Sequence, residues 1–146
     1  SSFEDRNSAV FTRGIVHAGQ GLHFAGQLQN QRGISQSSAG AGYSSFGKDS
    51  SWFVDLYRMQ SSYYGDSLHG FAYYSRDFGQ SYRASGFVER IDPQDGHGSS
   101  VTFSQFSVLR KVSDIWVGVE HQRYFNKDGI RGLDESVNQF VVKLDF

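Results

Sequence analysis

Several features are scarce or missing in this sequence, and each narrows the choice of fold. The chain of 146 residues contains no cysteine, which fits a route through an oxidising periplasm, and a single proline. Hydrophobic residues make up only 38%, and no apolar run approaches the roughly 18 residues that a membrane-spanning helix requires. The formal net charge of -1 gives no electrostatic basis for binding nucleic acid, so no nucleic-acid partner is expected.

Aromatic residues and glycine are abundant instead. Aromatic residues account for 16% of the chain, and there are 17 glycines. A membrane β-barrel needs apolar residues at only about half of its strand positions, because the other half faces the interior. The negative mean hydropathy is therefore compatible with a membrane protein, and a closed sheet is the one way in which this chain can span a bilayer.

The last eleven residues, 136–146, have a period of two. Phe140, Val142, Leu144 and Phe146 fall on one face, and Lys143 alternates with them on the other, together with Asp145. A soluble edge strand ends in the same way. The segment also resembles the closing strand of bacterial outer-membrane β-barrels, in which a terminal Phe after alternating apolar residues is read by the insertion machinery.

Residues 3–16 can be interpreted in two ways. As a strand, Phe11 and Ile15 share a face with Arg13, which is poor alternation. As a helix, Phe3, Val10 and other apolar residues approximate one stripe. The second interpretation predicts a short amphipathic helix that lies in the membrane interface.

Eight segments with a period of two follow, and turn residues separate them. They are Gln20–Asn30, Ser38–Phe46, Ser51–Gln60, Ser67–Ser75, Ser81–Ile91, Ser99–Arg110, Ile115–Phe125 and Ser136–Phe146. Short connections alternate with long ones along the chain. Outer-membrane barrels have short periplasmic turns, long external loops and an even number of strands.

The sequence thus predicts an all-β fold: an eight-stranded antiparallel up-and-down transmembrane β-barrel formed by residues 20–146, with the helix of residues 3–16 before it. We expect a single domain, integral to the bacterial outer membrane, monomeric, with both termini periplasmic. Soluble eight-stranded barrels of the lipocalin type share the strand count and are the alternative.

Alternation along the strands predicts which polar side chains face the interior of the barrel. They are His23, Asp55, His69, Arg83, Glu89, Glu120 and Lys143. Eight strands leave room for packed side chains or for one small ligand, so a wide pore is not expected. The first interpretation of this set is a network of paired charges that stiffens the barrel.

A second interpretation is catalytic. His23 lies on the first predicted strand, and Asp66 and Ser67 lie at the second long loop. These are the ingredients of acyl transfer: a histidine base, a serine hydroxyl that it activates, and an aspartate that orients the histidine or the donor ester. His69, two residues after Ser67, is an alternative base.

The order of elements is similar to that of the outer-membrane lipid A palmitoyltransferase family. That family has an amphipathic helix, eight strands, a His on the first strand and an Asp-Ser pair after the third. Leu22–Ala25, which contains His23, stands where the family's His lies. Leu56–Met59 followed by Gly65–Ser67 resembles the segment that leads to the family's Asp-Ser pair. Gly70–Tyr73 resembles the strand that lines the floor of the acyl pocket, with Ala72 near that floor. The resemblance implies transfer of a palmitoyl chain from a phospholipid to lipid A, without a cofactor.

Two other functions stay open. His121 followed by Glu135-Ser136 suggests a lipid A deacylase, but Arg123 stands where that class has its Ser. A non-enzymatic barrel with a polar, plugged interior and a structural or adhesive role is the other possibility. The five histidines have no metal-ligand spacing, so we expect neither a metal nor a cofactor.

Overall fold

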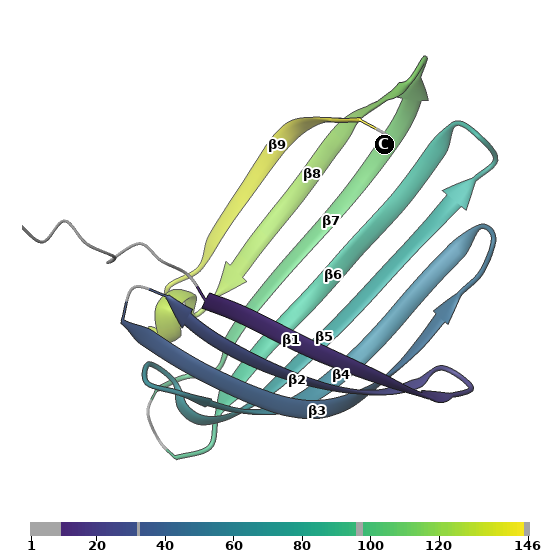
Figure 1. Ribbon diagram of the computed structural model, residues 1–146. Helices are drawn as coiled ribbons and strands as arrows, with labels where there is room; N and C mark the ends of the chain where they lie inside the picture. The colour runs from purple at the N-terminus through teal and green to yellow at the C-terminus, as the bar shows by residue number, and fades with distance from the viewer. Residues whose placement is uncertain (1–9, 32, 96–97, 145–146) are drawn as a thin grey trace, which may run out of the picture.

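The computed structural model describes residues 10–31, 33–95 and 98–144, which form one antiparallel sheet (Figure 1). Nine strands follow one another across the sheet in chain order. They are β1 Val10–Gly19, β2 Leu22–Gln31, β3 Ile34–Phe46, β4 Ser50–Ser61, β5 Gly65–Phe78, β6 Tyr82–Pro93, β7 Val101–Val112, β8 Ile115–Phe125 and β9 Glu135–Leu144. The described part of the chain has one short 3-10 helix, η1 (Lys127–Gly129), and no helix that is long and apolar enough to cross a membrane.

The all-β antiparallel prediction is confirmed, but the predicted number of strands is wrong. Residues 10–16, expected in a helix, belong to β1, and residues 3–9 lie outside the described residues. The backbone of β1 pairs with β2 from Val10 opposite Asn30 to His17 opposite His23. A tight turn at Gln20 and Gly21, both with positive φ, makes this hairpin possible. The sequence pattern of residues 10–19 alone does not show that these residues can pair with the edge of β2.

The sheet is a curved, open one. β1 and β9 are its edges, and they do not pair with each other in the described residues (Figure 1). With nine antiparallel strands both edge strands run in the same direction, so Val10 and Leu144 lie at opposite ends of the sheet. The expectation that an even strand count brings both termini to one side therefore does not hold for these strands.

Successive strands are staggered along the sheet. One row of paired residues begins at His17, two residues before the end of β1, and crosses every strand in turn. It reaches β9 at Glu135, the first residue of that strand. A stagger of this kind is the feature that lets a sheet curl toward a barrel.

The connections at the two ends of the sheet differ less than the sequence predicts. One end has the turns at 20–21, 47–49, 79–81 and 113–114, and the other has the loops 94–100 and 126–134 but also the short links 32–33 and 62–64. The links are short because β3 begins at Ile34 and β5 at Gly65, earlier than predicted. Polar residues such as Ser35 and Asp66 continue the ladders there.

The two faces of the sheet have different side chains. His23 on β2 and Asp55 on β4 meet across β3, which identifies their face as the concave one. The most buried side chains lie on this face, among them Met59, Leu109 and Trp116. On the convex face, large apolar side chains such as Leu56, Val119 and Phe140 are exposed.

The predictions about these faces that rest on alternation agree with the structure. Phe140, Val142 and Leu144 are all exposed on one face of β9, whereas Lys143 reaches Glu120 on the other. Asp145 and Phe146 lie outside the described residues. The seven polar residues predicted to face inward all lie on the concave face. Residues opposite each other in the ladder share a face, as do residues two apart on one strand, and the pairing of the strands places all seven on the face of His23 and Asp55 in this way.

Candidate functional site

A buried polar cluster lies on the concave face and consists of His23, Asp55 and Tyr57, which we call the His23 cluster. His23 Nε2 lies 2.6 Å from Asp55 Oδ1, and the Tyr57 hydroxyl donates a hydrogen bond to Asp55 Oδ2 at 2.5 Å. All three residues are less than a tenth exposed. The aspartate thus uses both of its oxygens on neighbouring side chains, as a buried carboxylate must to offset its loss of solvation.

Gly42 on β3 makes this contact possible. It is opposite His23 on one side and opposite Asp55 on the other, so the two side chains have to meet above it. A Cβ at Gly42 would lie 2.6 Å from His23 Nε2 and would also overlap Asp55 Oδ1. The absence of a side chain at this one position therefore lets residues from β2 and β4 form a direct pair.

The second ring nitrogen of His23 has a different environment. Nδ1 is buried and has no hydrogen-bond partner among the described residues. The ring of His17 is a neighbour, with its centroid 6.1 Å away at an interplanar angle of 57°. A histidine held by a carboxylate through one nitrogen has the geometry of a general base at the other, but no hydroxyl is hydrogen-bonded to Nδ1 here.

The polar row continues onto β5 and β6. The ring centroids of Tyr57 and His69 are 5.8 Å apart, and His69 Nε2 lies 2.8 Å from Glu89 Oε1. This approach is not an aligned hydrogen bond, because the same nitrogen has no hydrogen-bond partner in the described residues. His69 therefore faces Glu89 and not Ser67.

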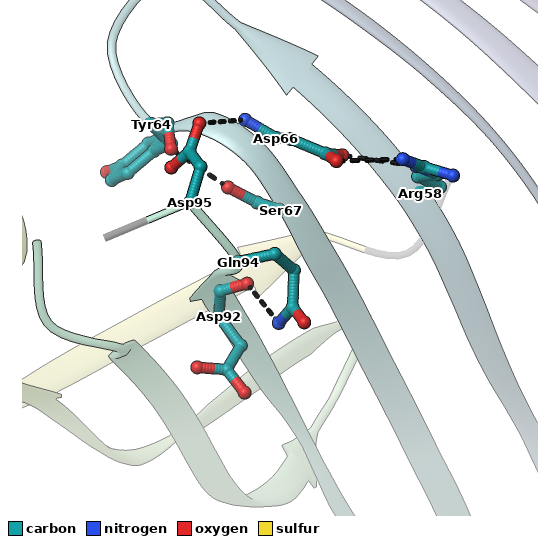
Figure 2. Close-up of polar contacts among 7 residues, drawn as sticks. All are labelled: Arg58, Tyr64, Asp66, Ser67, Asp92, Gln94 and Asp95. Carbon is teal, nitrogen blue, oxygen red and sulfur yellow. Dashed lines mark hydrogen bonds and ion pairs between the residues drawn. The ribbon is translucent and has the colours of Figure 1, made fainter. Parts of the chain in front are cut away.

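Asp66 and Ser67, the other two predicted catalytic residues, lie at the start of β5 (Figure 2). Arg58 donates two hydrogen bonds to Asp66, from Nε to Oδ1 at 3.1 Å and from Nη2 to Oδ2 at 2.8 Å. The Asp66 backbone N–H donates to Asp95 Oδ2 at 3.0 Å. Asp66 therefore acts in an ion pair at the rim of the sheet.

Ser67 is fully buried, and its hydroxyl donates a hydrogen bond to the carbonyl oxygen of Tyr64 at 3.1 Å. Burial raises the pKa of the phenol of this Tyr64. Among the described residues no histidine is hydrogen-bonded to Ser67 Oγ, and the hydroxyl connects the 62–64 link to β5 (Figure 2).

The structure does not bring His23 to Ser67. Asp55 of β4 is opposite Phe71 of β5, and Met59 is opposite Ser67, so Ser67 lies four residues from the level of His23 and Asp55. At the rise of an extended strand this separation is about 13 Å. Asp55 is the partner that the catalytic interpretation missed; its inward position and the glycine between it and His23 were the available signals.

Other residues singled out from the sequence lie apart from this cluster. Ala72, implied as the floor of an acyl pocket, is exposed on the convex face. His121 Nδ1 lies 2.7 Å from Asn138 Oδ1, also on the convex face, and Arg123 lies over the ring of Phe125 at 4.1 Å. Ser136 is opposite Arg123 in the ladder, and it lines a cavity of about 150 Å³ together with His121 and Glu135.

Charged groups on the rest of the concave face are also paired. Glu120 accepts hydrogen bonds from Gln122, Gln139 and Lys143, and it is one-twentieth exposed. Arg83 donates two hydrogen bonds to Asp77 and lies 4.4 Å from the centroid of the Trp116 ring. The arrangement is a set of ion pairs along the concave wall.

A cavity of about 610 Å³ opens at the end of the sheet where β2 ends and β5 begins. Leu28 lines it together with serine and glutamine side chains from β2, β3 and β4 and with Asp66 and Asp95. An acyl chain in it would desolvate the polar side chains without replacing their hydrogen bonds. In the described ranges no three His, Asp or Glu residues form a group that could hold a metal ion.

Replacing Gly42 with alanine tests the importance of the His23 cluster. The new Cβ must displace the His23 and Asp55 side chains, so we expect Gly42→Ala to lower the free energy of unfolding by about 1 to 3 kcal/mol. Gly70→Ala on β5 is the matched control, because a Cβ at Gly70 meets no atom within 4 Å. Urea denaturation measures both, and equal stability of the two variants would contradict the expectation.

Comparison of the chain with protein-family models, with curated proteins and with solved structures found no match in any of the three. The similarity to lipid A palmitoyltransferases thus stays a prediction from the sequence.

Proposed function

We propose that this sheet is the wall of a β-barrel in the bacterial outer membrane, with its convex face against lipid and its concave face toward a polar interior. The observation that carries the proposal is the exposure of large apolar side chains on the convex face. They include Val16, Phe24, Leu28, Leu56, Val88, Phe106, Val119, Phe140 and Val142, each between 47% and 74% exposed. Water-soluble monomers rarely expose apolar residues over so large a continuous area.

The apolar residues of the convex face are neighbours across strands. Val108, Val119 and Phe140 form one row over β7, β8 and β9. Phe24, Ala41 and Leu56 form another over β2, β3 and β4. Rows of this kind make a band around the sheet, which is what the hydrocarbon layer requires of a barrel wall.

Aromatic side chains lie near the short-turn end of the convex face. The rings of Tyr43 and Trp52 stack with centroids 6.1 Å apart, and Tyr74 is opposite Trp52 in the ladder. Tyrosine and tryptophan gather where a barrel wall passes through the headgroups, because their rings are apolar and their edges are polar. This placement supports a girdle at that end.

The proposal requires the edges of the sheet to be joined in the membrane. An unpaired row of backbone groups along β1 or β9 would cost several kcal/mol per group in hydrocarbon. β1 and β9 run in the same direction, so a direct pair between them would be parallel. The tilt of the strands and the curvature of the sheet support closure, which completes the proposed barrel.

A non-catalytic role accounts for the contacts of the concave face better than acyl transfer does. Ser67 is buried, and its hydroxyl donates a hydrogen bond to a backbone carbonyl. His23 is held by a contact with the Asp55 carboxylate. A plugged interior requires paired charges, whereas an acyl chain requires a dry cavity. The pairs Arg83 with Asp77 and Lys143 with Glu120 support the first.

The two tryptophans allow a direct test of the membrane proposal. Trp52 lies on the convex face, and Trp116 lies on the concave face, where it is 4% exposed. The variant Trp116→Phe keeps Trp52 as its single tryptophan, and the variant Trp52→Phe keeps Trp116. In vesicles of phospholipid brominated on the acyl chain, we expect strong quenching of Trp52 fluorescence and little quenching of Trp116. Equal quenching, or a folded monomer that needs no detergent, would contradict a lipid-facing convex side.

Mass spectrometry of lipid A tests the catalytic alternative. After incubation of the wild-type protein with phospholipid donors of several chain lengths, we expect no added acyl group on lipid A. A product that disappears in both His23→Ala and Ser67→Ala, with folding unchanged, would instead support acyl transfer at His23, Asp66 and Ser67.

A further inference from the structure

Two arginine side chains line a cavity at the loop end of the convex face, here called the arginine cavity. Its volume is about 650 Å³. Arg90 of β6 and Thr102 of β7 are opposite each other in its wall, and Phe125 of β8 is opposite Thr102. The loops 94–100 and 126–134 contribute further lining residues, among them Ser99, Asn126 and Arg131. No acidic residue is among the described residues that line the cavity, so the charge of this lining is positive.

Hydrogen bonds between the two loops hold the walls of the arginine cavity in place. Asn126 Nδ2 donates a hydrogen bond to the carbonyl oxygen of Ser100 at 3.1 Å, and Asn126 Oδ1 accepts one from the Gly132 N–H at 2.8 Å. Gly132 directly follows Arg131, so the two bonds position the backbone that carries Arg131 beside the start of β7. The cavity is therefore formed before a ligand binds, which reduces the cost of ordering it.

Neither arginine of the cavity is neutralised by a carboxylate of the described chain. Arg90 Nη1 donates a hydrogen bond to the Thr102 hydroxyl at 3.3 Å, and this partner is neutral. Among the described residues no ion pair includes Arg90 or Arg131. Asp92 shares the convex face with Arg90, two residues away on β6, but its carboxylate accepts a hydrogen bond from the Ser100 hydroxyl. The guanidinium groups therefore keep donors for an anionic ligand.

The arginine cavity lies at the border of the apolar surface. Val88, two residues before Arg90 on the same face of β6, is 47% exposed, and the rise of a strand places the two about 7 Å apart. Phe106, four residues after Thr102 on the same face of β7, is 55% exposed. In the proposed barrel, lipid chains contact Val88 and Phe106. This contact puts the cavity at the depth of the lipid headgroups.

We propose that the arginine cavity binds the phosphate group of a membrane lipid, an inference that rests on the proposed lipid-facing role of the convex face. The planar guanidinium of arginine matches a phosphate with two parallel N–H···O bonds, which are strong because both groups are charged. The Ser99 and Thr102 hydroxyls lie in the same lining and can donate to the remaining phosphate oxygens. The volume falls within the roughly 300–1,000 Å³ of ligand sites, so the cavity has room for the phosphate and the polar group attached to it.

A lipid is a better source of this phosphate than a free phosphate ion. Both make the same contacts with Arg90 and Arg131, but a lipid also has acyl chains beside Val88 and Phe106. The chains hold the phosphate at the cavity, which raises its local concentration there without an additional polar contact. A free ion lacks this advantage, so we expect it to bind more weakly.

Native mass spectrometry tests the proposal on protein kept in dodecyldimethylamine oxide, a detergent without phosphate. The probe is dioctanoylphosphatidic acid. We expect the wild type to bind it, and Arg90→Gln and Arg131→Gln each to weaken the affinity about tenfold through loss of a charge-assisted contact. Arg90→Lys keeps the charge but loses the planar fork, so its affinity should lie between those of the wild type and Arg90→Gln.

Arg76→Gln is the matched control, because it removes the same charge from an exposed arginine at the other end of the convex face. Its affinity for the probe should equal that of the wild type. Dioctanoylglycerol has the same chains without the phosphate, and its binding should not depend on Arg90 or Arg131. Because all three arginines are exposed, we expect the variants to keep the circular dichroism spectrum of the wild type.

Several outcomes would overturn the proposal. They are absence of probe binding to the wild type, unchanged affinity in Arg90→Gln and Arg131→Gln, and an equal loss in Arg76→Gln, which would indicate a general attraction between opposite charges. Displacement of the probe by an equal concentration of inorganic phosphate would identify a soluble ion as the ligand instead of a lipid. Quenching of Trp52 depends on contact with acyl chains and not on these arginines, so failure of this site leaves the membrane proposal separately testable.

Discussion

Alternation along each strand is the constraint on which the rest of this structure depends. Successive side chains of a strand point to opposite faces, so every second residue of all nine strands must suit the convex side and every other residue the concave side. Exposed apolar residues such as Leu56 and Phe140 occupy the first set, and His23, Asp55 and Glu120 the second. A register slip of one residue would exchange the two sets, which makes the pairing specific.

The curvature of the sheet decides which polar side chains come into contact on the concave face. Where the sheet bends, side chains from strands that are not neighbours can meet, as His23 and Asp55 do above Gly42. Gly40 and Gly118 are similar: a Cβ at either would overlap the backbone of an adjacent strand. Glycine on the concave side therefore permits the close approach of neighbouring strands.

The concave face combines two kinds of surface that are seldom mixed in a protein core. Ion pairs and hydrogen-bonded amides lie on either side of a diagonal of stacked rings. The rings contribute favourable stacking with one another, and the ion pairs satisfy charges that are partly removed from water. The convex face carries an ion pair near its rim, between Arg58 and Asp66.

Eight of the nine strands, and the faces of their residues, were predictable from the sequence, because the period of two is a local property. It is visible around Phe140, Val142 and Leu144 without knowledge of any partner. It also identified His23, Asp55 and Glu120 as inward-facing. The pairing of residues 10–19 with β2 as a ninth strand was not predictable in this way, because the edge with which a strand pairs is provided by another segment. Only the tertiary structure decided that His23 meets Asp55 and not Ser67, because register and curvature, and not order along the chain, set which side chains come together.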